Sequence, residues 1–310
     1  MQILYFLESI RTPFWDAVFS AFTHLGEETL AIAVALFLYW CVSKKWGCYS
    51  LLVTFFSLYL NQFAKIVCRV SRPWVAYPGF TIVESARAQA AGYSFPSGHT
   101  ANVTATLGSW ARFTKKKWLR IIFLVLIAVV SFSRMYLGVH YPTDVLFSLV
   151  VGAALIFLFY RIYEKGEGIS IRIRITFLLT ILLSLAFVLF LRLRTWPADI
   201  EMENLTSARK NAYLMTGLSA GMIVGIYFDK NVIDFRVKAP WWAQILKTVI
   251  GLALVVALKS GLKAIFPDAL WWTAPRYFLT AVFASCVWPL TFPWFARGFR
   301  RKTPEAVKAE

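Results

Sequence analysis

The chain has 310 residues, of which 59% are hydrophobic and 17% aromatic, whereas only 16% are charged, with a formal net charge of +17. A soluble globular chain carries about 25% charged residues, so this composition, with a mean hydropathy of +0.61, indicates a helical membrane protein. It excludes a disordered chain, a disulfide-stabilised scaffold and a secreted soluble enzyme.

Apolar segments of near-spanning length follow one another along the chain, and nine of them predict membrane spans. Residues 12–24 precede them with aromatic residues on one helical face, which favours an interfacial helix over a further span. The nine predicted spans are 29–43, 48–68, 99–113, 119–136, 143–162, 174–192, 211–228, 242–264 and 273–296. We therefore predict an all-α polytopic membrane helical bundle. Its parts are an interfacial N-terminal segment (1–28), a six-span core (29–194) and a C-terminal membrane extension of about three spans (195–310).

Basic residues are concentrated in alternate turns, such as Lys44–Lys45, Lys115–Lys117 and Arg161–Lys165. Positive turns face the cytoplasm and contact anionic headgroups, so membrane lipids, and not nucleic acid, are the expected partners of this charge. The opposite turns, including the long one at 69–98, then lie outside the cytoplasm. That side is extracytoplasmic in a bacterial plasma membrane, which is the localisation we expect, and luminal in an internal eukaryotic membrane.

Glycines recur every four residues in the seventh predicted span, at positions 217, 221 and 225. Small residues at this spacing let membrane helices approach closely. We expect this stripe to pack against the six-span core rather than to form a dimer seam.

Three clusters of polar residues lie at the outer ends of predicted spans. The first runs from Lys65 to Pro73, the second from Phe95 to Thr100, and the third from Ser133 to Asp144. Because four span ends meet on one face of the membrane, these clusters are expected to converge on one pocket.

The cations of this pocket are Lys65, Arg72 and Arg134. Unpaired charge is expensive at membrane depth, so three cations call for a polyanion, and phosphate matches the fork of arginine. Ser97 and Gly98 open the next helix, where backbone N–H groups and the serine hydroxyl form a site for an oxyanion.

Two histidines supply the reactive groups. His140 precedes Asp144 by four residues. If the fifth predicted span is already helical there, the carboxylate lies on the same face, can accept one imidazole N–H and leaves the other nitrogen to attack phosphorus. His99 arrives from another helix and can protonate the leaving oxygen. No carboxylate cluster with metal-ligand spacing accompanies them, so metal-independent chemistry without a cofactor is expected.

Together, the three clusters resemble the tripartite signature of the type-2 phosphatidic acid phosphatase superfamily, which also includes vanadium haloperoxidases. The resemblance covers about residues 25–192, and the hydropathy excludes the soluble haloperoxidase branch. It implies a phosphate cradle of Lys65, Arg72, Ser97, Gly98 and Arg134, with a nucleophilic His140, an orienting Asp144 and a general acid His99. The residues after about 195 lie outside this pattern.

A lipid phosphatase follows as the expected function, acting on a phosphorylated lipid such as phosphatidic acid, phosphatidylglycerophosphate or undecaprenyl diphosphate. Two alternatives remain: a lipid phosphotransferase with the same phosphohistidine, and a non-catalytic protein that binds or translocates phospholipid. In the long outer turn, Arg69, Glu84 and Arg87 are candidate headgroup contacts, and Glu84 alternatively pairs with Arg87.

Overall fold

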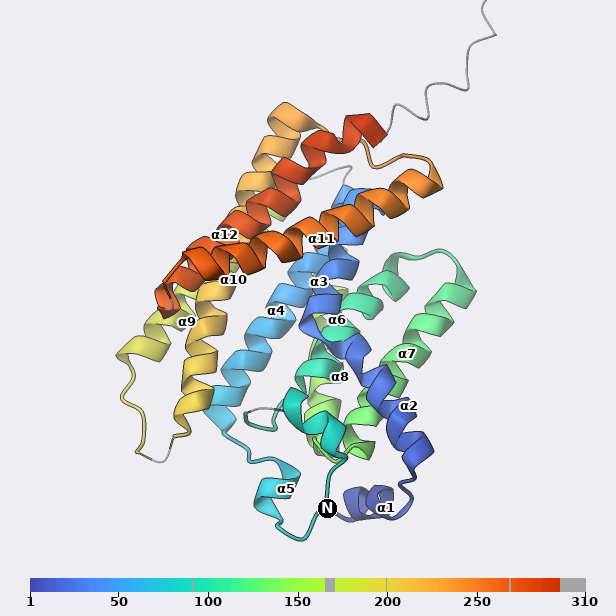
Figure 1. Cartoon of the computed structure of the whole chain (residues 1–310), viewed down its shortest axis with the longest axis vertical. Coiled ribbons are helices and arrows are strands. Elements are labelled where there is room, and N and C mark those ends of the chain that lie inside the picture. The colour runs from blue at the N-terminus through green and yellow to red at the C-terminus, as the bar shows by residue number, and fades with distance from the viewer. Residues whose placement is uncertain (91, 165–170, 199, 268, 296–310) are drawn as a thin grey trace, which may run out of the picture. The chain divides into compact units, whose positions relative to one another are not determined.

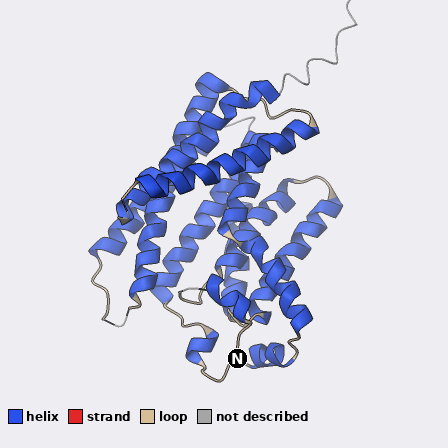
Figure 2. Cartoon of the chain, in the orientation of Figure 1, coloured by secondary structure: helices blue, strands red, loops and turns tan. Residues whose placement is uncertain are grey.

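The computed structural model describes residues 1–90, 92–164, 171–198, 200–267 and 269–295. Within those ranges every regular element is a helix, and Figure 2 shows helices joined by loops. In lipid a helix satisfies its backbone hydrogen bonds internally, which is why an apolar chain of this length folds so. The predicted all-α class is confirmed.

Twelve α-helices follow one another through the described residues (Figure 1). Their bounds are α1 (Gln2–Ser9), α2 (Pro13–Thr23), α3 (Glu28–Phe37), α4 (Lys44–Cys68), α5 (Pro73–Ala76), α6 (Gly98–Phe113), α7 (Lys117–Tyr136), α8 (Pro142–Glu164), α9 (Ile171–Leu193), α10 (Met202–Phe228), α11 (Trp241–Ile265) and α12 (Thr273–Val282). A short 3-10 turn, η1 (His24–Gly26), links α2 to α3, and a π-helical turn, η6 (Phe283–Val287), continues α12.

The number of spans differs from the nine predicted. In the described residues, seven helices are long and apolar enough to cross a membrane. The two that fall short are α3, with 10 residues, and α6, with 16. Residues 13–26 and 28–42 are long and apolar enough to cross a membrane only as a pair, which is bent by 55°. Counting this pair as one span would raise the number to eight. The expectation of nine spans is therefore corrected, because two apolar segments form helices shorter than a bilayer requires.

The described chain forms two compact units. Unit 1 comprises residues 1–35, 49–164 and 184–212, and unit 2 comprises residues 36–48, 171–183 and 213–295. The three-part division at residues 28 and 194 stays a prediction.

Helix α6 is the centre of unit 1, where it packs against both α7 and α8. Its buried face carries small and hydroxyl residues, among them Ala101, Thr104 and Ala105. Gly152 of α8 lies directly over Thr104, so closely that a Cβ there would come within 2.6 Å of the threonine methyl. Such close backbone approach brings the N-terminus of α6 beside the start of α8, and the functional residues lie at these two ends.

Unit 2 contains the glycine stripe. A Cβ at Gly217, Gly221 or Gly225 would overlap atoms of α12 or of η6, among them the carbonyl oxygens of Ala274 and Phe278. The prediction that the stripe packs against the core was wrong: its partner is α12, in the same unit. The four-residue spacing reports close approach, but it contains no information about which helix approaches.

Candidate active site

The three predicted clusters meet in unit 1. Lys65 lies in the last turn of α4, Arg134 in the last turn of α7, and Asp144 in the first turn of α8. Ser97 caps α6, because its hydroxyl accepts from the Thr100 N–H, and its own N–H donates to the Asp144 carbonyl at 3.3 Å. The ends of α6 and α8 are thereby joined.

His140 lies between a carboxylate and a guanidinium. Its Nδ1 is 3.3 Å from Asp144 Oδ2, and its Nε2 is 2.9 Å from Arg72 Nη1. A guanidinium only donates, so Nε2 accepts, and the proton of the neutral ring resides on Nδ1, facing Asp144. Both His140 and Asp144 are buried. This arrangement leaves the Nε2 lone pair as the reactive position of the imidazole.

The Asp144 carboxylate is itself held by two further donors. The Ser94 hydroxyl donates to Oδ2 at 2.6 Å, and the Tyr141 backbone N–H donates to the same oxygen at 2.9 Å. Ser94 was absent from the sequence prediction. It lies three residues before Ser97 in the long turn, and its only signal was its proximity to that motif.

Two of the cations are oriented by backbone carbonyls of the long turn. Arg72 Nε donates to the Gly92 carbonyl at 2.8 Å, and Lys65 Nζ donates to the Tyr93 carbonyl at 2.7 Å. The same backbone is held from α10, where Asn204 Oδ1 accepts the Tyr93 N–H at 3.1 Å. Gly92 has φ +74°, and a Cβ there would overlap Asn204 Oδ1. Asn204 was also missed, because nothing in its local sequence points to a partner so far back in the chain.

The third cation, Arg134, retains donors that are not used. It is fully buried, and its Nη1 donates to the Thr23 hydroxyl. Its Nε and Nη2, like Nε2 of His99, are buried without a hydrogen-bond partner among the described residues. Gly26 of η1 packs against His99, since a Cβ on it would lie 2.8 Å from the His99 Cβ. Burying unpaired guanidinium donors is costly, so these groups are arranged for an anion.

The pKa of His140 depends on its burial and on the three predicted cations of the site. Burial lowers its pKa well below the usual histidine value, and the positive charges of Arg72, Arg134 and Lys65 lower it further. The imidazole is therefore neutral at physiological pH, the form that can act as a nucleophile.

The candidate headgroup residues lie apart from these contacts. Arg87 and Glu84 pair with each other on the surface, with Nε to Oε2 at 2.7 Å. Arg69 follows α4 in the left-handed region, at φ 50°, and its N–H donates to the Lys65 carbonyl. Gly98 is the first residue of α6. Across the described residues, no group of three or more His, Cys, Asp or Glu side chains could hold a metal ion.

Comparison with known proteins gives two family matches. Residues 46–167 match the PAP2 superfamily, and residues 213–298 match a transmembrane extension of PAP2 superfamily phosphatases. No solved structure matches the chain.

Three curated relatives are similar to this chain. A lipid A 4'-phosphatase of Bacteroides thetaiotaomicron is 31% identical over 53% of this chain and 76% of its own length. The undecaprenyl-diphosphatase BcrC of Bacillus subtilis is 37% identical over 38% of this chain and 58% of its own length. Phosphatidylglycerophosphatase B of Bacillus subtilis is 30% identical over 50% of this chain and 79% of its own length.

Proposed function

Because this chain belongs to the PAP2 superfamily, we propose that it hydrolyses a lipid phosphate through a phosphohistidine formed on His140. It is an integral membrane lipid phosphatase, a phosphoric ester hydrolase. The observation that carries the mechanism is His140, buried with Asp144 on one ring nitrogen and Arg72 on the other.

In the first step the substrate phosphate enters the cradle. Lys65, Arg72 and Arg134 face its oxygens, and the unused Nε and Nη2 of Arg134 donate to them. The Ser97 hydroxyl and the N–H groups that begin α6, including that of Gly98, add the positive end of a helix. Binding the anion thus compensates cations whose burial is otherwise unfavourable.

In the second step His140 Nε2 attacks phosphorus in line with the leaving oxygen. The N–P bond forms as the P–O bond breaks, and His99, which takes up a proton when the anionic phosphate binds beside it, gives that proton to the departing oxygen. The Arg72 donor that contacts Nε2 shifts to a phosphoryl oxygen as the nitrogen becomes bonded. Asp144 stabilises the positive charge that develops on the imidazole, as the carboxylate of a catalytic triad does.

In the third step water attacks the phosphohistidine, and His99, now neutral, takes its proton. The N–P bond breaks, and inorganic phosphate leaves. Phosphate-ester hydrolysis is among the slowest uncatalysed reactions, so most of the acceleration must come from fixed positive charge around the transferring phosphoryl group.

The proposal also includes the class of substrate and the side of the membrane on which the active site lies. The relatives are named for phosphatase activity on lipid A, undecaprenyl diphosphate and phosphatidylglycerophosphate, which supports a lipid phosphate or diphosphate as substrate here. The alternating basic turns support an active site on the extracytoplasmic side of a bacterial plasma membrane. On that side Arg69, Glu84 and Arg87 would meet the headgroup.

The test is phosphate release by the full chain in detergent, with EDTA present, from phosphatidic acid, phosphatidylglycerophosphate, undecaprenyl diphosphate and a sphingoid-base phosphate. We expect release from at least one lipid and a loss of about 10³-fold or more in His140→Ala, because the nucleophile is removed. His24→Ala is the matched control, since His24 is exposed and bonds to Glu27 instead.

Each other outcome contradicts the proposal in its own way. Near-normal release by folded His140→Ala would refute the phosphohistidine. Transfer of the phosphoryl group to an added acceptor without free phosphate would make the chain a phosphotransferase. Binding without any turnover would leave only a phospholipid-binding or translocating protein.

A further inference from the structure

The N-terminal segment of unit 1, residues 11–26, contacts the cradle although it lies outside the three clusters of the sequence signature. Thr23, the last residue of α2, is 2% exposed and accepts a hydrogen bond from Arg134 Nη1. Within the described chain, this is the one hydrogen bond that the guanidinium of Arg134 makes. The direction in which the guanidinium faces therefore depends on Thr23.

The contact leaves one edge of the guanidinium free. Nε and Nη2, which are buried without a partner among the described residues, lie on the same edge of this planar group, and their N–H bonds point the same way. Such an edge donates two parallel hydrogen bonds to an oxyanion. Because Thr23 binds the third nitrogen, Nη1, it determines where this edge points.

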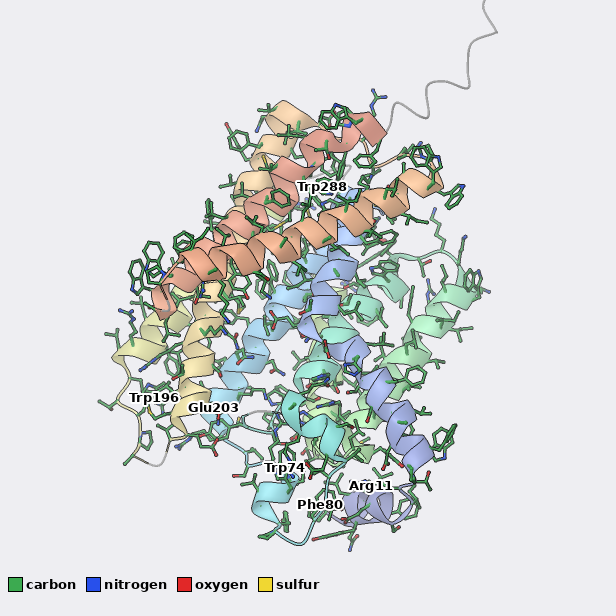
Figure 3. All side chains as sticks on the ribbon, in the orientation of Figure 1. Arg11, Trp74, Phe80, Trp196, Glu203 and Trp288 are labelled. Carbon is green, nitrogen blue, oxygen red and sulfur yellow. The ribbon has the colours of Figure 1, made fainter. Side chains whose placement is uncertain are left out.

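Thr23 is itself held in place by both ends of the segment. Arg11, labelled in Figure 3, donates through Nε to the Tyr136 carbonyl at the end of α7, at 2.9 Å. The Gly26 carbonyl accepts from Asn102 Nδ2 of α6 at 3.0 Å. The segment is thus tied to α7 and α6, the helices that carry the third cation and the general acid, and it presents the threonine hydroxyl from a rigid frame.

We propose that Thr23 is a positioning residue for catalysis: through its hydrogen bond to Nη1, it turns the Nε–Nη2 edge of Arg134 toward the phosphoryl group. The inference rests on the proposed function, because it takes the phosphate to be bound in the cradle. Thr23 precedes both family matches, which begin at residues 46 and 213. The orientation of an arginine of the signature thus depends on a residue that neither match includes.

The experiment measures two quantities on the full chain in detergent. One is equilibrium binding of orthovanadate, a tetrahedral analogue of phosphate, and the other is kcat/KM for the lipid from which phosphate is released fastest. Thr23→Val keeps the shape of the side chain and removes the hydroxyl. We expect it to weaken vanadate binding about tenfold and to lower kcat/KM about 10- to 100-fold, because a displaced guanidinium no longer meets the phosphoryl oxygens. Thr23→Ser keeps the hydroxyl and should restore most of both.

A double-mutant cycle tests whether Thr23 acts through Arg134. Arg134→Met removes the guanidinium, so the hydroxyl has no group left to orient. Adding Thr23→Val to Arg134→Met should therefore leave vanadate binding at the level of Arg134→Met alone. A threonine with a purely structural role would instead weaken binding by the same factor in both backgrounds.

Thr54→Val is the matched control. Thr54 is also buried in unit 1, on α4, and its hydroxyl has no hydrogen-bond partner among the described residues. The control should match wild type in both measurements. If Thr23→Val does not fold, Thr23→Ala, which removes the same hydroxyl, takes its place in every comparison.

The proposal is overturned if Thr23→Val binds vanadate as tightly as wild type, if Thr23→Ser is as impaired as Thr23→Val, or if the two substitutions of the cycle are additive. Failure of the proposed function would be seen separately, as phosphate release that His140→Ala does not affect. The two results are distinguishable because vanadate binding is measured without turnover.

Discussion

Arg134 and His140 show why the individual residues of this site need a phosphate. Arg134 is fully buried with two donor nitrogens unused among the described residues. The imidazole of His140 is kept neutral by its burial and by the surrounding positive charge, both of which lower its pKa. Burying such a cluster of positive charges is unfavourable unless an anion binds to it. Burial and the same positive charge that binds phosphate therefore together keep the nucleophile unprotonated.

This protonation state predicts a pH dependence. A lowered pKa means that His140 stays neutral as the pH falls and takes up a proton only below the usual histidine value of about 6.5. Because the neutral ring is the nucleophile, the acid limb of kcat/KM, which reports the free enzyme, should lie below pH 6.5. The measurement is kcat/KM from pH 4.5 to 8, corrected for the titration of the lipid phosphate itself. An acid limb at or above pH 6.5 that remains after this correction would contradict the assignment.

At the scale of elements, α10 reaches the cradle through Asn204. Its side chain accepts the Tyr93 N–H and so holds the carbonyls to which Lys65 and Arg72 donate. Asn204 is thus a positioning residue: it acts on Lys65 and Arg72 through the Gly92–Tyr93 backbone, to which both of these side chains donate.

Replacing Asn204 tests this role. In Asn204→Ala the Tyr93 N–H loses its acceptor, the Gly92–Tyr93 backbone relaxes, and the cations that donate to it move relative to phosphorus. Small displacements of positioning groups cost about 10- to 100-fold in rate, so kcat should fall by about that factor for every lipid. Asn204→Asp keeps an acceptor and should restore most of the rate. A purely structural role would instead lower the melting temperature and leave kcat of the folded fraction unchanged.

At the scale of the whole molecule, the distribution of charge determines which side of the membrane the active site faces. The long turn at 69–98 carries the surface pair of Glu84 and Arg87, whereas Lys115–Lys117 crowd the turn between α6 and α7. Positive turns remain in the cytoplasm, so these two turns should lie on opposite sides.

Cysteine labelling tests this topology. In a background with all four native cysteines replaced by alanine, Glu84→Cys and Lys116→Cys both place a thiol at an exposed position. A membrane-impermeant maleimide should label Glu84→Cys in intact bacteria and Lys116→Cys only after permeabilisation. The reverse pattern would place the active site in the cytoplasm, and retained phosphate release confirms that each variant is folded.

Much of this protein could be predicted from local spacing. Apolar runs predict the helices because burial in lipid depends on the composition of each segment by itself. The interval of four residues between His140 and Asp144 predicts their contact, which the structure contains at 3.3 Å. The helix α8 begins only at Pro142, so His140 reaches the carboxylate from the turn before the helix and not from a shared helix face. Ser97 directly precedes α6 and caps it, a role that serine commonly takes at the start of a helix.

The remaining features depend on which segments pack together, and no local pattern encodes that. Arg72 meets His140, Thr23 meets Arg134, and Asn204 meets Tyr93 only because α2, α4 and α7 end, and α8 and α10 begin, near one another in unit 1. The glycine stripe shows the same limit, since its spacing predicted close packing but the wrong partner. The periodicity of a segment indicates which face of its helix is buried. Which helix packs against that face depends on the shapes of whole helix surfaces, and these meet only in the folded chain.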